Sequence, residues 1–263
     1  MSKDISTADT FAAYVHEGRS PVAVLVIHGF TSTPGSVFLW AGAFEAAGYD
    51  VSVPLLEGHS SRWEDMIGVP YTAWTGALER EYDRLARSHD HVVVAGISMG
   101  GALALHLGAV RRPDAVLLVN PAVDGLPWFA FLSGALAPFL KSTPAIGEDI
   151  ARPGRRENSY DVTPTAAATE LRRLQRAVRR QLPGVVAPIT LFHSVQDHVV
   201  PPASLRSLLA GLTPAARTRL RRVELHESYH VATLDWDAEL INEASVAAVA
   251  EATGVPADSG AQA

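Results

Sequence analysis

The sequence predicts an α/β fold built on a mostly parallel sheet, and three observations support this. Short, continuously apolar runs rich in β-branched residues recur along the chain, as in strands covered on both faces. Helix-like segments separate these runs, and such alternation is typical of parallel sheets. The chain has 263 residues, of which 48% are hydrophobic and 19% charged, which suits one α/β domain with a large core.

The first two predicted strands carry the most informative motifs. Residues 22–27 form an apolar run that ends in a His-Gly dipeptide at positions 28–29, and residues 92–95 form a second run. The second run leads into residues 96–100, Gly-Ile-Ser-Met-Gly, and a helix-like segment follows. A serine on such a sharp strand-to-helix turn has its hydroxyl lifted clear of the sheet, and flanking glycines avoid clashes there. We therefore expect Ser98 to be a nucleophile.

The same two segments predict a backbone site for a developing negative charge. Hydrolases whose nucleophilic serine lies on a strand-to-helix turn stabilise the oxyanion with two backbone N–H groups. One belongs to the residue after the nucleophile, and the other comes from the loop after a neighbouring strand. Here those donors would be the amides of Met99 and Phe30. The simpler alternatives are a solvated serine in a glycine-rich turn and a plain turn at the end of a strand.

A serine nucleophile needs a base, and the base needs an orienting carboxylate. Asp197 lies just past a predicted strand at 189–193, and His230 follows another at 222–226. Ligands collect at the carboxyl edge of a parallel sheet, and the chain order serine, acid, histidine suits this architecture. These positions predict Ser98, Asp197 and His230 as a catalytic triad.

Other histidines fit the role of base less well. His198 adjoins Asp197, and side chains of neighbouring residues rarely converge in one hydrogen bond. His226 falls inside a strand pattern, where a packed or solvated histidine is the simpler interpretation. The remaining candidates lack a position after the last strand: His16, His59, His89, His91, His106 and His193.

Four segments carry a family resemblance: residues 28–31, 96–101, 197–202 and 228–235. They resemble the bacterial monoacylglycerol lipase and carboxylesterase family of the α/β-hydrolase superfamily, and the similarity covers nearly the whole chain. The resemblance implies an α/β-hydrolase fold, with a mostly parallel central sheet flanked by helices and a cap inserted over the active site. It implies the same triad that the strand positions indicate.

A break in the strand-helix alternation predicts where the cap lies. We expect residues 121–187 to form this cap or lid and residues 1–120 and 188–263 to form the hydrolase core. The cap includes a helix-like run over 164–182. Its large apolar side chains either line an acyl-chain tunnel or pack the cap onto the core: Trp128, Phe129, Phe131, Leu132, Leu136, Phe139 and Leu140.

The resemblance also implies a binding site for the alcohol portion of the substrate. Residues 155–160 match the cap segment in which the family holds a glycerol-binding glutamate, so Glu157 is expected to bind substrate hydroxyls. The carbonyl at the position of Ile146 assists in the family. Arg155, Arg156 and Asn158 depart from the family's pattern, and a mere surface carboxylate is the alternative for Glu157.

The sequence therefore predicts a serine ester hydrolase that cleaves monoacylglycerols and short- to medium-chain esters through an acyl-enzyme on Ser98. This chemistry requires neither a metal nor an organic cofactor. The alternatives are a general carboxylesterase or thioesterase without glycerol preference, a carbon–carbon bond hydrolase and a non-enzymatic binding module. A haloalkane dehalogenase is disfavoured, because an aspartate would stand in the place of Ser98.

Composition limits which binding partners and which cellular compartment we expect. A net charge of −6 gives no reason to expect nucleic acid or an anionic membrane, and the absence of cysteine excludes disulfides and thiolate metal sites. No apolar run approaches membrane length, and the first residues lack the apolar core of a signal peptide. We expect a cytoplasmic enzyme with a small-molecule ester or lipid substrate and no stable membrane insertion. The oligomeric state stays open.

Overall fold

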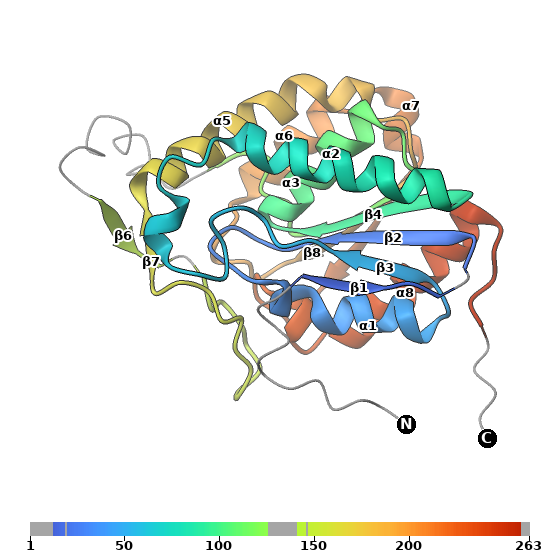
Figure 1. Cartoon of the computed structure of the whole chain (residues 1–263), viewed down its shortest axis with the longest axis horizontal. Helices are drawn as coiled ribbons and strands as arrows, with labels where there is room; N and C mark the ends of the chain where they lie inside the picture. The colour runs from blue at the N-terminus through green and yellow to red at the C-terminus, as the bar shows by residue number, and fades with distance from the viewer. Residues whose placement is uncertain (1–12, 19, 126–140, 146, 259–263) are drawn as a thin grey trace.

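A seven-stranded sheet runs through the middle of the molecule (Figure 1). The computed structural model describes residues 13–18, 20–125, 141–145 and 147–258. The strands of the sheet are β1 (Tyr14–His16), β2 (Val22–Ile27), β3 (Asp50–Val53), β4 (His91–Ile97), β5 (Ala115–Val119), β8 (Ile189–Ser194) and β9 (Leu220–Leu225). Their order is β1-β3-β2-β4-β5-β8-β9. β1 pairs antiparallel with β3, and every other neighbouring pair is parallel, which confirms the predicted fold class.

Helices cover both faces of this sheet (Figure 1). The α-helices are α1 (Phe38–Ala46), α2 (Tyr71–Ser88), α3 (Met99–Val110), α5 (Thr165–Gln181), α6 (Pro202–Gly211), α7 (Pro214–Thr218) and α8 (Ala238–Thr253). The 3₁₀ turns are η2 (Pro34–Val37), η3 (Trp63–Met66), η5 (Leu182–Gly184) and η6 (Ala232–Leu234). α1 and α8 lie on one face, and α2, α3, α5 and α6 lie on the other.

The central strands β2 and β5 are apolar throughout because both of their faces are buried. Along β2, Val22, Val24 and Val26 contribute to the core beneath α1 and α8. The alternate residues of the same strand contribute to the core beneath α2, α3 and α5. Side chains of a strand point to opposite faces in turn, so a central strand with two covered faces shows no polar positions. This explains why continuous apolar runs located the central strands correctly.

The chain between β5 and β8 contains a small antiparallel ribbon and one long helix. The ribbon pairs β6 (Ser142–Pro144) with β7 (Val162–Pro164). α5 follows directly and packs against α3, α2 and α6. It matches the helix-like run at 164–182. The large apolar residues that the sequence assigns to a tunnel or to cap packing, 128–140, lie outside the described residues.

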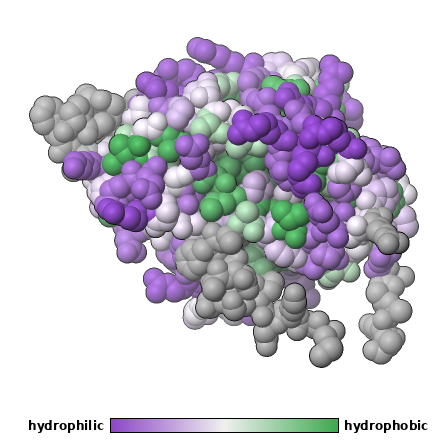
Figure 2. Space-filling view, in the orientation of Figure 1, coloured by the Kyte–Doolittle hydropathy of each residue, from purple (hydrophilic) through white to green (hydrophobic). Residues whose placement is uncertain are grey.

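Hydrophilic residues cover most of the face shown in Figure 2, and hydrophobic residues gather in the middle of that view. No described helix is long and apolar enough to cross a membrane. Within the described ranges, no group of three or more His, Asp or Glu side chains converges in a way that could hold a metal ion.

Candidate active site

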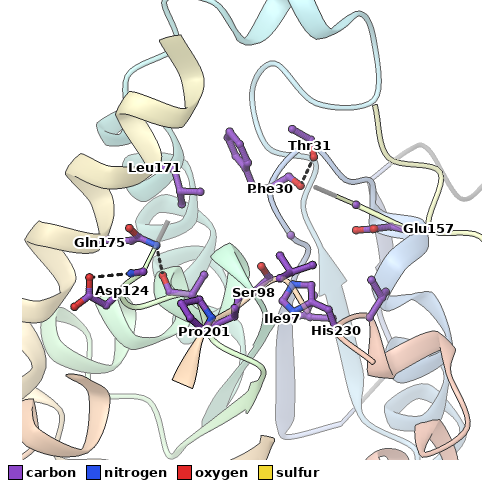
Figure 3. Close-up of a pocket in the computed structure, with 17 residues that line it drawn as sticks. Phe30, Thr31, Ile97, Ser98, Asp124, Glu157, Leu171, Gln175, Pro201 and His230 are labelled. Atoms are coloured by element: carbon purple, nitrogen blue, oxygen red, sulfur yellow. Dashed lines mark hydrogen bonds between the residues drawn. The ribbon is translucent and has the colours of Figure 1, made fainter. Parts of the chain in front are cut away.

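Ser98 stands at the turn between β4 and α3. Its backbone has φ 55° and ψ −118°, a conformation that non-glycine residues rarely adopt and that costs about 1–3 kcal/mol. The Ser98 N–H donates to the Val119 carbonyl oxygen at 3.0 Å, which ties the turn to the end of β5. The serine thereby lines a pocket at the carboxyl edge of the sheet, with about 630 Å³ of empty space that is partly open to solvent (Figure 3).

Close backbone approach requires the two glycines around the serine. A Cβ on Gly96 would collide with the carbonyl oxygen of Gly100. A Cβ on Gly100 would collide with the carbonyl oxygen of Ile27, at the end of β2. Moving the Gly100 carbonyl oxygen would distort α3, and moving the Ile27 carbonyl oxygen would distort the sheet. The Gly-x-Ser-x-Gly spacing is therefore a steric requirement of this turn.

The two expected oxyanion donors are Phe30, in the loop after β2, and Met99, directly after Ser98 in the chain. Phe30 lines the same pocket as Ser98, and Met99 is the first residue of α3. Within the described part of the chain, neither backbone N–H has a hydrogen-bond acceptor. The dipole of α3 adds positive potential at its first turn. Both N–H groups are therefore available to an anion.

His28 orients the Phe30 amide. Burial lowers the pKa of His28 to about 4, so its imidazole is neutral near pH 7. The Leu56 N–H donates to Nε2 at 3.2 Å, so the proton lies on Nδ1, 2.9 Å from the Gly29 carbonyl oxygen. That carbonyl and the Phe30 N–H belong to one planar peptide group. The hydrogen bond from His28 therefore fixes the direction of the Phe30 N–H.

The candidate acid and base meet at the same edge of the sheet. Asp197 follows β8, and its Oδ2 lies 2.9 Å from Nδ1 of His230, in the loop after β9. The other carboxylate oxygen of Asp197 accepts the N–H groups of Val199 and Val200, each at 2.8 Å. Both side chains of the pair are almost fully buried. Nδ1 of the imidazole is therefore bound by a carboxylate that two backbone N–H groups hold in place.

Burial and charge oppose each other at this pair. Burial alone would lower the pKa of His230, but the carboxylates of Asp197, Glu157 and Asp149, with Asp197 contributing most, together outweigh burial and raise that pKa above its ordinary value. Burial likewise opposes ionisation of Asp197, yet His230 and the two backbone N–H groups hold the pKa of Asp197 below its ordinary value. The geometry suits a histidine that accepts a proton while the carboxylate stays ionised.

The loop that carries His230 is anchored to the ends of two strands by Asn120. The amide nitrogen of Asn120 donates to the His230 carbonyl oxygen at 2.8 Å and to the Ser194 hydroxyl at 2.9 Å. The Ser194 N–H in turn donates to the amide oxygen of Asn120 at 2.8 Å. This buried network connects β5, β8 and the histidine loop.

His230 and Ser98 line one pocket and lie next to each other in Figure 3. No hydrogen bond joins their side chains within the described part of the chain. Such bonds are often long in the absence of substrate and tighten in the reacting complex. The arrangement places a serine, a histidine and two available N–H groups around one cavity.

Glu157 lies on the His230 side of this pocket, and Leu171 and Gln175 of α5 lie on the other (Figure 3). Only 6% of Glu157 is exposed, so it is not a surface carboxylate. Its Oε2 accepts the Glu148 N–H at 3.0 Å. Burial raises the pKa of Glu157, although the bond from Glu148 favours the charged form. Ile146, the other residue expected here, lies outside the described residues.

Comparisons with known proteins identify the family. A family model described as serine aminopeptidase S33, a hydrolase family, matches residues 19–236. A thermostable monoacylglycerol lipase of Bacillus sp. (strain H-257) is 38% identical over 254 residues, which cover 95% of this chain and 97% of that protein. The chain belongs to this family of serine hydrolases.

Other proteins similar to this hydrolase are also esterases or lipolytic enzymes. A carboxylesterase of Bacillus subtilis (strain 168) is 22% identical over 222 residues, or 84% of this chain and 89% of that protein. A structure reported with two metagenome-derived lipolytic enzymes, LipS and LipT, superposes with a TM-score of 0.87 at 32% identity, covering 92% of this chain and 98% of that one. The protein is therefore a serine ester hydrolase with the α/β-hydrolase fold, and its substrates are small-molecule esters.

His198 and His226, the alternative candidates for the base, lie outside the Ser98 pocket. His198 bonds to Asp149 rather than to Asp197, with Nδ1 2.9 Å from the carboxylate, and 60% of its side chain is exposed. The His226 side chain is also largely exposed, and its nearest carboxylate, Glu224, lies 3.9 Å away. Neither histidine lines the pocket of Ser98.

Sequence reasoning missed several residues that hold the site together. They are His28, Asn120, Asp149 and Asp235. His28 carried a local signal as part of the His-Gly dipeptide after β2, and Asp235 lies within the 228–235 segment that carries the family resemblance. Asn120 and Asp149 act on groups far away along the chain. Asp235 accepts the nearby Tyr229 N–H and the distant Ala151 N–H, and no spacing within one segment reveals the second.

Proposed function

We propose that this hydrolase cleaves monoacylglycerols and related short- to medium-chain carboxylic esters through an acyl-enzyme on Ser98. Oγ of Ser98 attacks the ester carbonyl carbon while Nε2 of His230 takes the hydroxyl proton. Asp197 keeps the imidazole in the required tautomer and stabilises the imidazolium. The N–H groups of Phe30 and Met99 bind the resulting oxyanion.

The second half of the proposed reaction uses the same groups. His230 returns the proton to the leaving alcohol, and the acyl group stays on Ser98. A water molecule then attacks this ester, with His230 again as the base, and the carboxylic acid leaves. The raised pKa of His230 supports this role, because the imidazole must accept a proton twice in each cycle.

The observation that carries the glycerol preference is the buried Glu157 carboxylate in the wall of the Ser98 pocket. A carboxylate accepts hydrogen bonds from two neighbouring hydroxyls, whereas the alcohol portion of a simple alkyl ester has none to offer. The name of the 38% identical relative, a monoacylglycerol lipase, supports the same substrate class. In this proposal the alcohol portion lies towards Glu157 and the acyl portion towards Leu171 and Gln175.

We further propose that residues 121–187 act as a cap over this site and that the core comprises 1–120 and 188–263. Support comes from the lining of the pocket, because the proposed cap supplies Gly147, Glu157, Leu171 and Gln175. A serine site with such a covering selects its substrate by the shape and polarity of the insertion.

Matched substrates test this proposal. A monoacylglycerol and the methyl ester of the same acid are compared in the unsubstituted enzyme and in Glu157→Gln. A charged acceptor bonded to a substrate hydroxyl contributes about 1.5–3 kcal/mol, or roughly 10- to 150-fold in kcat/KM. We expect Glu157→Gln to lose about that factor on the monoacylglycerol and to leave the methyl ester nearly unchanged.

The exposed Glu239 of α8 offers a matched control, and Glu239→Gln should change neither rate. A loss on both substrates in Glu157→Gln would indicate general damage to the pocket. Equal rates on both substrates in the unsubstituted enzyme would leave a general carboxylesterase. Thioester, diketone and peptide substrates in the same assay test the alternative reactions, including the one in the family's description.

A further inference from the structure

Asp149 lies outside the proposed triad, yet it contacts the backbone of both loops that carry the triad's acid and base. Its Oδ2 accepts the N–H of His230 at 3.1 Å and the N–H of His198, the residue after Asp197, at 3.2 Å. Its own carbonyl oxygen accepts the Val231 N–H at 3.0 Å. One carboxylate oxygen therefore joins two loops that follow different strands.

This bridge is placed where small movements matter. The Asp197–His230 hydrogen bond spans the same two loops, so a shift of either loop changes its length or angle. A displacement of about 1 Å from productive geometry costs on the order of 100-fold in rate. A charged acceptor also holds backbone N–H groups more strongly than a neutral one.

The ion pair between Asp149 and His198 does not explain this arrangement. The side chain of His198 is 60% exposed, and exposed ion pairs contribute little to stability. The Asp149 side chain is only 16% exposed, and its two backbone bonds go to His230 and to the residue after Asp197. The backbone contacts, rather than the exposed imidazole, place Asp149 next to the site.

Asp149 also belongs to the segment that carries the proposed alcohol-binding residue. Residues 147–160 run from Gly147 past Asp149 to Glu157, and both Gly147 and Glu157 line the pocket. The neighbouring Glu148 turns the other way and accepts the N–H of Glu157 at 3.1 Å. Two consecutive carboxylates thus connect one segment to the triad loops and to the Glu157 backbone.

We propose that Asp149 is a positioning residue that sets the distance and angle between Asp197 and His230. This inference rests on the proposed function in taking His230 as the base. The charged groups that face the His230 imidazole are Asp197, Glu157 and Asp149. Asp149 in turn faces His198 and His230.

Three variants distinguish the positioning effect of Asp149 from the effect of its negative charge. Asp149→Ala removes the bridge, and we expect kcat to fall about 10- to 100-fold with a smaller change in KM. Asp149→Asn can place its amide oxygen at the Oδ2 position, where it still accepts both backbone N–H groups. It should keep most of kcat while the ascending limb of kcat/KM against pH moves to lower pH, because one negative charge near His230 is gone. His198→Ala leaves both backbone bonds intact and should keep kcat and the pH profile.

A second measurement needs neither substrate nor turnover. The proton on Nδ1 of His230 that bonds to Asp197 should give a far-downfield ¹H resonance in the unsubstituted enzyme. We expect this resonance to persist in Asp149→Asn and His198→Ala and to shift or broaden away in folded Asp149→Ala. If Asp149→Ala does not fold, Asp149→Ser serves instead, because its short hydroxyl cannot reach both N–H groups.

Two results would overturn the inference: an Asp149→Ala enzyme with the kcat of His198→Ala, or an unchanged His230 resonance in a variant that lacks the bridge. Failure of the proposed function looks different, because the unsubstituted enzyme would then hydrolyse the monoacylglycerol and the methyl ester at equal rates while the resonance still reported the bridge. The two ideas can therefore fail separately.

Discussion

The serine turn (residues 96–100) and the 147–160 segment border the same pocket but are held by different interactions. In the turn, backbone atoms of β2, β4 and α3 approach so closely that glycine alone fits at two positions. In the 147–160 segment, side-chain carboxylates hold backbone N–H groups instead. Asp235 alone accepts four, from Ala151, Arg152, Tyr229 and Trp236.

The two regions of the pocket therefore differ in what a substitution would disturb. Ser98 lies at a turn where Gly96 and Gly100 leave no room for a Cβ. The 147–160 segment depends on polar contacts, which allow the residues that line its side of the pocket to change without disturbing the sheet. Substitutions in the serine turn and in the 147–160 segment should therefore change kcat, stability and substrate preference to different extents.

The largest effect is expected at the serine turn. Gly100→Ala would bring a Cβ against the carbonyl oxygens of Ile27 and His28, both backbone atoms of the sheet edge. Overpacking against backbone costs about 3 kcal/mol or more and should move Ser98 away from Phe30 and Met99. We expect kcat to fall by orders of magnitude on every ester, together with a lower melting temperature. A variant with normal kcat would contradict the steric account.

The next largest effect is expected where the 147–160 segment meets the histidine loop. Asp235 is fully buried, and each of its oxygens accepts two N–H groups. In Asp235→Asn the new NH₂ group must face two N–H donors, whichever way the amide is turned. Leaving such donors buried and unpaired costs about 1–3 kcal/mol each. Thermal unfolding should show a drop of about 2–4 °C per kcal/mol, and an unchanged melting temperature would remove this role.

The smallest effect is expected within the 147–160 segment itself. A Cβ on Gly147 would meet the Ser159 side chain and lie 3.1 Å from Oε2 of Glu157. The Ser159 hydroxyl can turn away, and only its Cβ, at 2.9 Å, requires a small shift of the segment. Gly147→Ala should therefore cost less than Gly100→Ala, about 1–2 kcal/mol in stability. Its signature should be a weaker preference for monoacylglycerol over the methyl ester, with the methyl ester rate retained. Gly147→Ala as damaging as Gly100→Ala would erase the contrast between the two regions.

Much of the fold and the serine turn was predictable because the signals are local. Continuous apolar runs marked β2 and the middle of β4, since strands buried on both faces have few polar positions. The exposed edge strand β1 escaped notice, because a three-residue strand with partly buried side chains carries no such pattern. The Gly-x-Ser-x-Gly spacing is readable because the clash it avoids lies within one turn.

The supports of the site were not predictable from spacing. Asp149 and the His230 N–H that it accepts are 81 positions apart, and Asp235 and the Ala151 N–H are 84 apart. A backbone N–H has no residue type, so no sequence pattern reveals which carboxylate it will meet. Only the folded chain brings these groups together.

The most direct test of the central claim is covalent labelling of the nucleophile. A fluorophosphonate probe reacts with a serine only when a neighbouring base and oxyanion donors activate it. We predict one equivalent of adduct per chain, located by peptide mass spectrometry at Ser98, with no adduct in a folded Ser98→Ala variant and loss of ester hydrolysis by orders of magnitude. An adduct of equal yield in Ser98→Ala, or hydrolysis that survives this substitution, would contradict the assignment of Ser98 as the nucleophile.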